Sequence, residues 1–256
     1  MIRISGRPVT PENISNQYSL NSIQRDIITT MSSSNGIYDY ESLSQLKFEL
    51  DLRMSIINAA RQLNNSNFSF RVFKKSFCNT DYWTRTNEGG FLLKSNVKPS
   101  DAINDIFVNG RKYGTECATA MVIIFYKAVL DSYPEELFNT MFSSIHLMNW
   151  HYINKNLDIG YYSDEVDYFP GDCRYFKNPD VNPLTPEWQG ENTIDLGDGT
   201  YYGHGIGISS ANGIIRALNR NRKVGATRSA YLMDSATRPG FKYLYSRYYS
   251  FTHSTN

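Results

Sequence analysis

One cysteine of the sequence stands where a polar turn gives way to a long apolar segment, and this position suits a nucleophile. Cys117 follows the turn at 113–116 and leads into residues 121–126, which are apolar on every side of a helix. We therefore expect a buried helix whose N-terminal tip alone reaches a cleft. A thiol in that first turn would lie at the positive end of the helix dipole, beside unpaired N–H groups that favour the reactive thiolate. The alternative is a buried cysteine that serves only as a small hydrophobic residue.

Such a thiol needs a base that takes its proton and a further group that orients the base. Of the four histidines, His204 is the best candidate for the base. His146 and His151 lie at odd spacing in a strand-like run, so they face opposite sides, and they lack the glutamate of a zinc-binding H-E-x-x-H helix. His253 belongs to a polar tail.

His204 is surrounded by glycines at positions 203, 205 and 207, which alternate with bulkier residues. This spacing predicts a strand with one bare face, open to close approach, and with His204 on the opposite face. A hydrogen-bonded core histidine beside a glycine-rich packing surface is the alternative. The glycines do not form a dinucleotide-binding fingerprint, because the G-x-G-x-x-G spacing is missing from this segment.

Glu191 could orient the imidazole, and the turn between two strands decides whether it can. If Asp198-Gly199 forms a two-residue type I′ turn, Glu191 lies on the same strand face as His204 and diagonal to it. A three-residue loop over 197–199 would shift the register by one residue and turn Glu191 to the other face. The catalytic interpretation therefore predicts the two-residue turn.

Glu116 directly precedes Cys117 and is a second carboxylate near the thiol. It could equally be a solvated glutamate that interacts favourably with the helix dipole. Two carboxylates beside one thiolate would raise the pKa of the thiol, so at least one of them must be protonated or directed at an imidazolium.

Composition and charge exclude several classes of protein. The chain has 256 residues and a formal net charge of +1, which is not the basic excess of a nucleic-acid-binding protein. Without an internal repeat or a long linker, we expect one catalytic domain over residues 1–256, with a basic, aromatic tail from about 241 to 256. Three cysteines without a spacing pattern argue against a disulfide framework and suit a reducing compartment.

The sequence also predicts no membrane and no cofactor. The N-terminus lacks the apolar core of a signal peptide, and no run is long enough to span a bilayer, so we expect a soluble chain made inside the cell. The acidic run 164–167 lacks the spacing of an EF-hand loop, and there is no Cys/His cluster, so no metal is expected. The basic C-terminal quarter is a solvated face or a docking surface for acidic partners.

The periodicity predicts helices followed by an antiparallel sheet, which is an α+β fold. Helices are expected over 41–63, from Pro99 to about 109, from Cys117 and from Pro134, and residues 82–94 are typical of a hairpin. Downstream, strand-like runs cover 145–152, 173–176, 192–196 and 200–208, followed by a helix at 212–218. A nucleophile on a buried helix with its partners on later strands is the layout of papain-like enzymes, by analogy of fold only.

Seven short segments together resemble a known family. They are residues 48–54 (FELDLRM), 116–120 (ECATA), 171–179 (GDCRYFKNP), 188–192 (WQGEN), 203–207 (GHGIG), 229–232 (SAYL) and 236–238 (ATR). In this order and at similar length, the chain resembles the small transglutaminases of Bacillus spores over nearly its whole length. Glutamine at 189, where the relative has a basic residue, and the longer tail from 241 depart from the family pattern.

The resemblance implies a single-domain papain-like or NlpC-type core and a calcium-independent protein-glutamine γ-glutamyltransferase, a monomer that cross-links spore coat proteins. It implies that the nucleophile corresponds to Cys117, the acidic partners to Glu191 and Glu116, and the histidine to His204. Its substrates would be proteins that donate glutamine and lysine side chains, joined through a thioester in a passage that excludes water. A cysteine peptidase or amidase on the same scaffold, or a non-enzymatic coat scaffold, are the alternatives.

Overall fold

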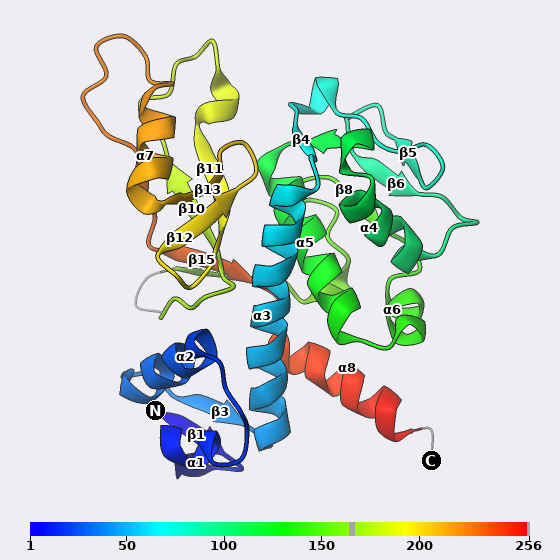
Figure 1. Cartoon of the computed structure of the whole chain (residues 1–256). Coiled ribbons are helices and arrows are strands. Elements are labelled where there is room, and N and C mark those ends of the chain that lie inside the picture. The colour runs from blue at the N-terminus through cyan, green and yellow to red at the C-terminus, as the bar shows by residue number, and fades with distance from the viewer. Residues whose placement is uncertain (164–166, 255–256) are drawn as a thin grey trace.

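Two helices form the centre of the protein. The computed structural model describes residues 1–163 and 167–254. α3 (Leu43–Asn65) runs along the long axis of the molecule, and α5 (Cys117–Ser132) packs beside its upper half (Figure 1). α5 is buried on nearly every side, as its apolar sequence predicts. Its N-terminal tip carries Cys117, so the core of the fold fixes the position of the candidate nucleophile.

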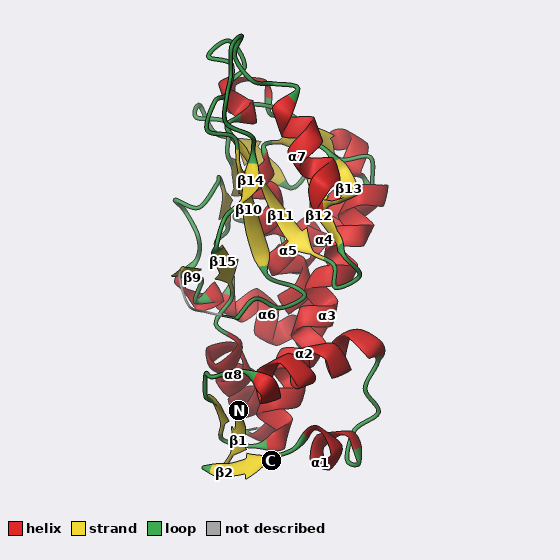
Figure 2. Cartoon of the chain, turned by 90° about the vertical axis from the view of Figure 1, so that its left-hand side faces the viewer, coloured by secondary structure: helices red, strands yellow, loops and turns green. Residues whose placement is uncertain are grey.

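An antiparallel sheet lies against this helix pair. Its strands follow the order β13 (Gly207–Ser210), β12 (Thr200–Gly203), β11 (Gly190–Asp195), β10 (Cys173–Lys177), β15 (Ser235–Arg238) and β9 (Gly160–Ser163), and β14 (Tyr231–Leu232) pairs with β10. Figure 2 shows α7 (Ala211–Asn219) in front of one face of the sheet and α3 and α5 behind it. Ile194 and Leu196 join the helix core, whereas Phe176 packs on Ile214 and Leu218 of α7.

Smaller units surround this centre. An N-terminal unit, residues 2–40, lies below the sheet and has its own hydrophobic core (Figure 1). The C-terminal helix α8 (Phe241–His253) packs on α3. The remaining elements are β1 (Ile2–Ile4), β2 (Arg7–Val9), α1 (Pro11–Ser15), α2 (Ser22–Ser33), β3 (Tyr38–Tyr40), β4 (Ser69–Phe70), η1 (Phe73–Lys75), β5 (Trp83–Arg85), β6 (Phe91–Leu93), α4 (Pro99–Val108), η2 (Gly110–Lys112), β7 (Gly114–Thr115), α6 (Glu135–Met141), β8 (His146–Leu147), η3 (Lys155–Leu157) and η4 (Pro186–Trp188).

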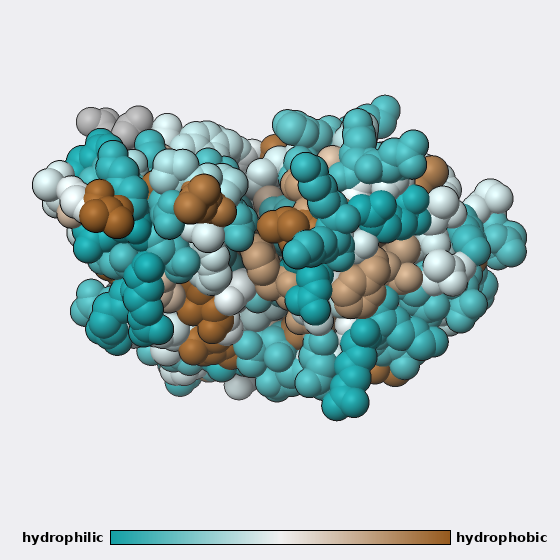
Figure 3. Space-filling view, turned by 90° about the horizontal axis from the view of Figure 1, so that it is seen from above, coloured by the Kyte–Doolittle hydropathy of each residue, from teal (hydrophilic) through white to brown (hydrophobic). Residues whose placement is uncertain are grey.

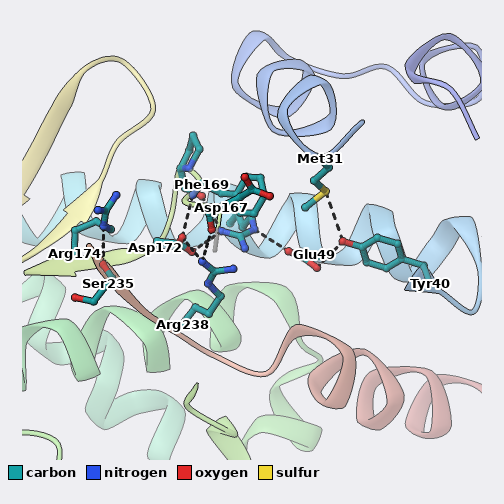
Figure 4. Close-up of polar contacts among 11 residues, drawn as sticks. Met31, Tyr40, Glu49, Asp167, Phe169, Asp172, Arg174, Ser235 and Arg238 are labelled. Carbon is teal, nitrogen blue, oxygen red and sulfur yellow. Dashed lines mark hydrogen bonds and ion pairs between the residues drawn. The ribbon is translucent and has the colours of Figure 1, made fainter. Parts of the chain in front are cut away.

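A buried network of charges ties α3 to the sheet (Figure 4). Arg53 of α3 donates to Glu49 at 3.0 Å and to Asp172 at 2.8 Å, and Arg238 of β15 donates to Asp172 at 2.7 Å. Tyr40 donates its hydroxyl to Glu49 at 3.0 Å, which connects the N-terminal unit to the same network. Three of the segments that carried the family resemblance, 48–54, 171–179 and 236–238, therefore meet here and join α3 to the sheet.

The α+β class and most of the predicted elements are confirmed. The helix predicted over 41–63 is α3, the hairpin over 82–94 is β5 and β6, and the helices expected from Pro99, Cys117 and Pro134 are α4, α5 and α6. No helix among the described residues is long and apolar enough to cross a bilayer. Most of the acidic run 164–167 lies outside the described residues.

Two predicted elements were wrong in form. The run 200–208 is not one strand but the hairpin β12 and β13, closed by a hydrogen bond from the Ile206 N–H to the Gly203 carbonyl at 3.1 Å. Gly207 has φ +89°, a conformation that glycine adopts without strain. Of the run 145–152, only His146–Leu147 is a strand, because the chain turns at Asn149, where φ is +41°. The basic, aromatic tail from about 241, for which the sequence predicted no form, is the helix α8.

Candidate active site

Cys117 is the first residue of α5, as its position in the sequence predicts, and Glu116 is the N-cap of the helix. One oxygen of the Glu116 carboxylate accepts from the Ala118 N–H at 2.7 Å, and the other from the Thr119 N–H at 2.6 Å. The helix tip therefore differs from the expectation of unpaired N–H groups around the thiol. A glutamate fills most of this site, since a carboxylate at a helix N-terminus is favoured by the same N–H groups that would favour a thiolate.

Glu116 also fixes the loop that follows α6. The Thr119 hydroxyl donates to Glu116 at 2.5 Å and accepts from the Asn149 N–H at 2.7 Å. This chain of hydrogen bonds holds the backbone of residues 149–150 over the helix tip and so places the ring of Trp150 at the cavity described below. The Glu116 carboxylate, engaged by three donors, is not the solvated side chain that the sequence left open.

The strand register places Glu191 differently from the prediction. Thr193 pairs with Gly203, and the Leu196 N–H donates to the Thr200 carbonyl at 3.0 Å, so residues 197–199 form a three-residue loop. The predicted two-residue Asp198-Gly199 turn is wrong. Gly197 and Gly199 both have positive φ, +75° and +79°, which supplies the backbone freedom that this longer loop requires. Glu191 consequently does not share a strand face with His204.

The charge of Glu191 nevertheless raises the pKa of the Cys117 thiol, and the Glu191 carboxyl is itself held in an unusual environment. The side chain is 2% exposed and accepts the Gly205 N–H at 3.1 Å. It lies so tightly on the turn after β12 that a Cβ at position 203 would come within 2.8 Å of the Glu191 Cγ, so Gly203 is required there. Burial, with a smaller contribution from the charge of Glu116, raises the pKa of Glu191 to about 8.

Asn192 is the site residue that the sequence interpretation missed. Its side-chain Nδ2 donates to the Cys117 Sγ at 3.5 Å. Neighbouring residues of a strand point to opposite faces, and Asn192 shares its face of β11 with Ile194 of the helix core, so Asn192 points towards α5. The three-residue loop, considered but not preferred from the sequence, was the signal that could have identified Asn192.

The thiol of Cys117 is not poised as a thiolate. Burial is the largest cause that raises its pKa well above the ordinary value, and the negative charges of Glu191 and Glu116 raise it further. The backbone and side-chain amides of Asn192 act in the opposite direction. Cys117 is therefore protonated at neutral pH, contrary to the expectation from the helix dipole, and any reaction must first move its proton.

The His204 imidazole has hydrogen-bond partners other than the sulfur and the Glu191 carboxyl, although the backbone N–H of His204 interacts with that carboxyl. Its Nδ1 lies 3.0 Å from the Tyr202 hydroxyl, its Nε2 lies 3.2 Å from the Ser69 carbonyl, and its ring packs on Phe68. Burial lowers the pKa of His204 to about 4, so the imidazole is neutral at pH 7. The arrangement matches the alternative interpretation of a hydrogen-bonded core histidine, which here joins β12 to β4.

A cavity of about 1140 Å³ opens on Cys117. Aromatic rings from four separate segments line it, among them Phe70, Trp150, Tyr161 and Tyr175, together with Glu116, Cys117 and Asn192. The face seen from above is mostly hydrophilic, with separate apolar spots rather than one wide apolar surface (Figure 3). The cavity is therefore large enough for two side chains at once, and its walls are suited to their aliphatic stems.

Comparison with known proteins identifies the family. A family profile described as "Protein-glutamine gamma-glutamyltransferase" matches residues 1–249. A protein-glutamine gamma-glutamyltransferase of Bacillus cereus (strain 03BB102) is 48% identical over 236 residues, 92% of this chain and 85% of the relative. The chain belongs to the protein-glutamine γ-glutamyltransferase family. The resemblance seen in the sequence is thereby confirmed.

Other members of the γ-glutamyltransferase family agree in sequence and in structure. The protein-glutamine gamma-glutamyltransferase of Bacillus anthracis (strain A0248) is 47% identical with the same coverage of both chains. The solved structure "Transglutaminase from Geobacillus stearothermophilus (without C-terminal extension)" is 53% identical and superposes with a TM-score of 0.76, over 80% of this chain and 97% of that one. The γ-glutamyltransferase match includes Cys117, Glu191, Asn192 and His204, so the whole candidate site lies within the family's common region.

Proposed function

We propose that this protein is a transglutaminase that joins a protein glutamine to a protein lysine through a thioester on Cys117, with residues 1–256 as one catalytic domain. One observation carries the proposal: in a family member, a cysteine on the wall of a cavity of about 1140 Å³ is within electrostatic range of a buried carboxyl whose pKa is about 8. A carboxylate with that proton affinity can take a proton from a thiol at near-neutral pH, which an ordinary glutamate with a pKa of 4.5 does far less well.

In the acylation step, the Cys117 thiol gives its proton to the ionised form of Glu191, and the sulfur attacks the carboxamide carbon of the glutamine. A tetrahedral intermediate forms, with a new S–C bond and the former carbonyl oxygen as an anion. Its collapse restores the C=O bond and breaks the C–N bond, and the proton held by Glu191 passes to the nitrogen, which leaves as ammonia. The enzyme is left as a γ-glutamyl thioester.

In the second step, the lysine amine attacks the thioester carbon. Glu191 accepts the proton of the amine, the C–S bond breaks, and the sulfur recovers its proton, so the product is an ε-(γ-glutamyl)lysine isopeptide bond. Water would hydrolyse the same thioester. The aromatic walls of the cavity, which Phe70 and Trp150 line together with Cys117, favour attack by the amine over attack by water. They displace solvent around the reactive carbon once both side chains are bound.

The decisive test supplies casein and a fluorescent primary amine to the wild type and to Cys117→Ala. We expect the wild type to attach the amine to casein with release of ammonia, and the variant to attach none while its circular dichroism spectrum is unchanged. Cys78→Ala is a matched control, because Cys78 is a free, half-buried thiol that does not line the cavity, and it should label casein normally. Casein fragments without label would indicate a peptidase, ammonia without label an amidase, and label with Cys117→Ala would refute the proposal.

Three finer parts of the proposal follow from the resemblance and have separate tests. The reaction uses only groups of the chain, so labelling should persist in an excess of the calcium chelator EGTA. Spore coat proteins are proposed as the substrates, so the protein should be recovered with the coat fraction of sporulating cells, with high-mass cross-linked coat protein that disappears in a deletion strain. A monomer is proposed, and light scattering should give a mass near 29.4 kDa.

A further inference from the structure

The oxyanion of the tetrahedral intermediate needs hydrogen-bond donors, and the tip of α5 cannot supply most of them. Glu116 already occupies the N–H groups of Ala118 and Thr119 with its carboxylate, and that of Ala120 with its carbonyl. Of the first-turn amides, Glu116 therefore leaves only the N–H of Cys117 for a bound substrate. One backbone donor is fewer than the two or more that usually stabilise such an anion.

The cations on the cavity wall do not fill this gap. The Arg174 guanidinium donates its Nε to the Ser235 carbonyl at 2.8 Å and its Nη2 to the Met233 carbonyl at 3.0 Å, so it is committed to the backbone of the sheet. Lys155, also on the wall, is exposed. Two carboxyl groups, Glu116 and Glu191, lie close enough to raise the pKa of the thiol, and they would repel a new negative charge as well. The oxyanion therefore needs a further donor close to the sulfur, and that donor should be neutral.

We propose that Asn192 is a catalytic residue whose side-chain amide, with the Cys117 N–H, binds the oxyanion of both tetrahedral intermediates. Its Nδ2 lies 3.5 Å from Sγ. In the intermediate, the anionic oxygen is attached to the carbon that is bonded to Sγ, so a donor beside Sγ is within hydrogen-bond reach of that oxygen. The amide is neutral, which adds no charge to a buried site, and the surrounding low dielectric strengthens each hydrogen bond to the anion.

The position of Asn192 is fixed before the substrate arrives. It belongs to β11, an inner strand of the sheet, and pairs with Tyr175 of β10. α5 packs directly on β11, so the two donors are carried by two elements of the rigid core rather than by a loop. A donor that needs no reorganisation during the reaction stabilises the transition state more than one that must first be ordered.

Asn192 could instead act only by stabilising the Cys117 thiolate. Two reactions of the same sulfur, alkylation and acylation, distinguish this role from that of an oxyanion donor. If Asn192 only stabilises the thiolate, its loss should slow every reaction of the thiol equally. Alkylation by iodoacetamide forms an S–C bond and expels iodide without an oxyanion, whereas acylation by a glutamine peptide passes through one. This inference rests on the proposed function, so p-nitrophenyl acetate serves as a further acyl donor that forms the same kind of oxyanion on Cys117 without a glutamine.

The experiment compares the wild type with Asn192→Ala and Asn192→Asp. We expect acylation, followed as ammonia or p-nitrophenol release, to fall about 10²- to 10³-fold in both variants. Alkylation of Asn192→Ala should slow by less than about tenfold over pH 7 to 9, because loss of the side-chain amide only raises the pKa of the thiol and removes no oxyanion donor that this reaction uses. Asn64→Ala, an exposed asparagine at the end of α3, is the matched control and should leave both rates unchanged.

Each outcome has a distinct meaning. Parallel loss of acylation and alkylation, or acylation by both donors within about threefold of the wild type, would overturn the role of Asn192 as an oxyanion donor. Thermal unfolding of each variant shows whether a loss comes from the fold, and the alkylation rate shows that the sulfur is still accessible. If the wild type reacts with p-nitrophenyl acetate but never with glutamine, the proposed transglutaminase function fails, while the ester still tests Asn192.

Discussion

Replacing Glu191 with glutamine should make the protein more stable at alkaline pH while it removes activity. The pKa of Glu191 is about 8 in the fold, against a reference value of 4.5. A group whose pKa is higher in the folded state contributes stability that is fully present below the unfolded-state pKa and is lost as the pH rises through the folded-state pKa. The wild type should therefore lose stability between about pH 4.5 and pH 8, whereas glutamine has no proton to lose.

The size of this effect follows from the same two pKa values. The rise from 4.5 to about 8 corresponds to about 5 kcal/mol at about 1.4 kcal/mol per pH unit. Between pH 5 and pH 9 the contribution of Glu191 to the free energy of unfolding should therefore fall by about 4 kcal/mol. Solvent screening reduces this little, since the side chain is 2% exposed. Glutamine is also close in size and keeps an oxygen for the Gly205 N–H.

Urea unfolding of both proteins at pH 5 and pH 9 measures the divergence. The free energy of unfolding of Glu191→Gln, relative to the wild type, should rise by about 4 kcal/mol from the lower to the higher pH. Acyl transfer should fall about 10²- to 10⁴-fold because the base is gone, while alkylation of Cys117 should accelerate, since removal of the negative charge lowers the pKa of the thiol. Asn64→Ala, which changes no titratable group, should show no such divergence. A difference between wild type and Glu191→Gln that is independent of pH would refute the reasoning.

Two further predictions concern the buried charges and the histidine. Arg53→Met should lower the free energy of unfolding by about 3–5 kcal/mol in a denaturant titration, because it removes the buried guanidinium that Glu49 and Asp172 share. Arg61→Met, which breaks a half-exposed ion pair with Asp198, should cost less than about 1 kcal/mol. Equal losses would contradict this account. The His204 imidazole, with a pKa of about 4, should stay neutral above pH 5 in ¹⁵N NMR spectra, and a ring titration near pH 6.5 would show that it is not held by Tyr202 as described.

The elements of the fold were largely predictable from the sequence because their signals are local. The helical spacing of α3 and the apolar run of α5 depend on neighbouring residues only. The position of Cys117 at a helix start was predictable for the same reason. The hairpin of β12 and β13 was missed because alternating glycines suit both a bare strand face and a reversal of the chain, and only packing against the rest of the sheet distinguishes the two.

The partners of the thiol were harder to predict because a turn that is longer by one residue shifts the register of the two strands. With a three-residue loop instead of two, Asn192 rather than Glu191 shares a strand face with His204, and both turns are compatible with the sequence Gly197-Asp198-Gly199. The protonation states were out of reach as well. Proximity to a helix dipole favours a thiolate at Cys117, yet burial and two nearby carboxyls raise the pKa of its thiol. Burial is a property of the complete fold, so the local sequence does not reveal it.

Desolvation provides one physical cause for three features of this site. It raises the pKa of Cys117, raises that of Glu191 to about 8 and lowers that of His204 to about 4, so each of the three groups favours its neutral form at neutral pH. A thiolate–imidazolium pair would need a charged histidine beside the sulfur, and here the histidine is held by Tyr202 and Ser69 instead. The proton must then pass between sulfur and carboxyl, two groups whose affinities burial has brought closer together. In the proposed mechanism, the same lack of solvent would protect the thioester from hydrolysis, so the burial that costs stability at high pH would also favour transfer to an amine.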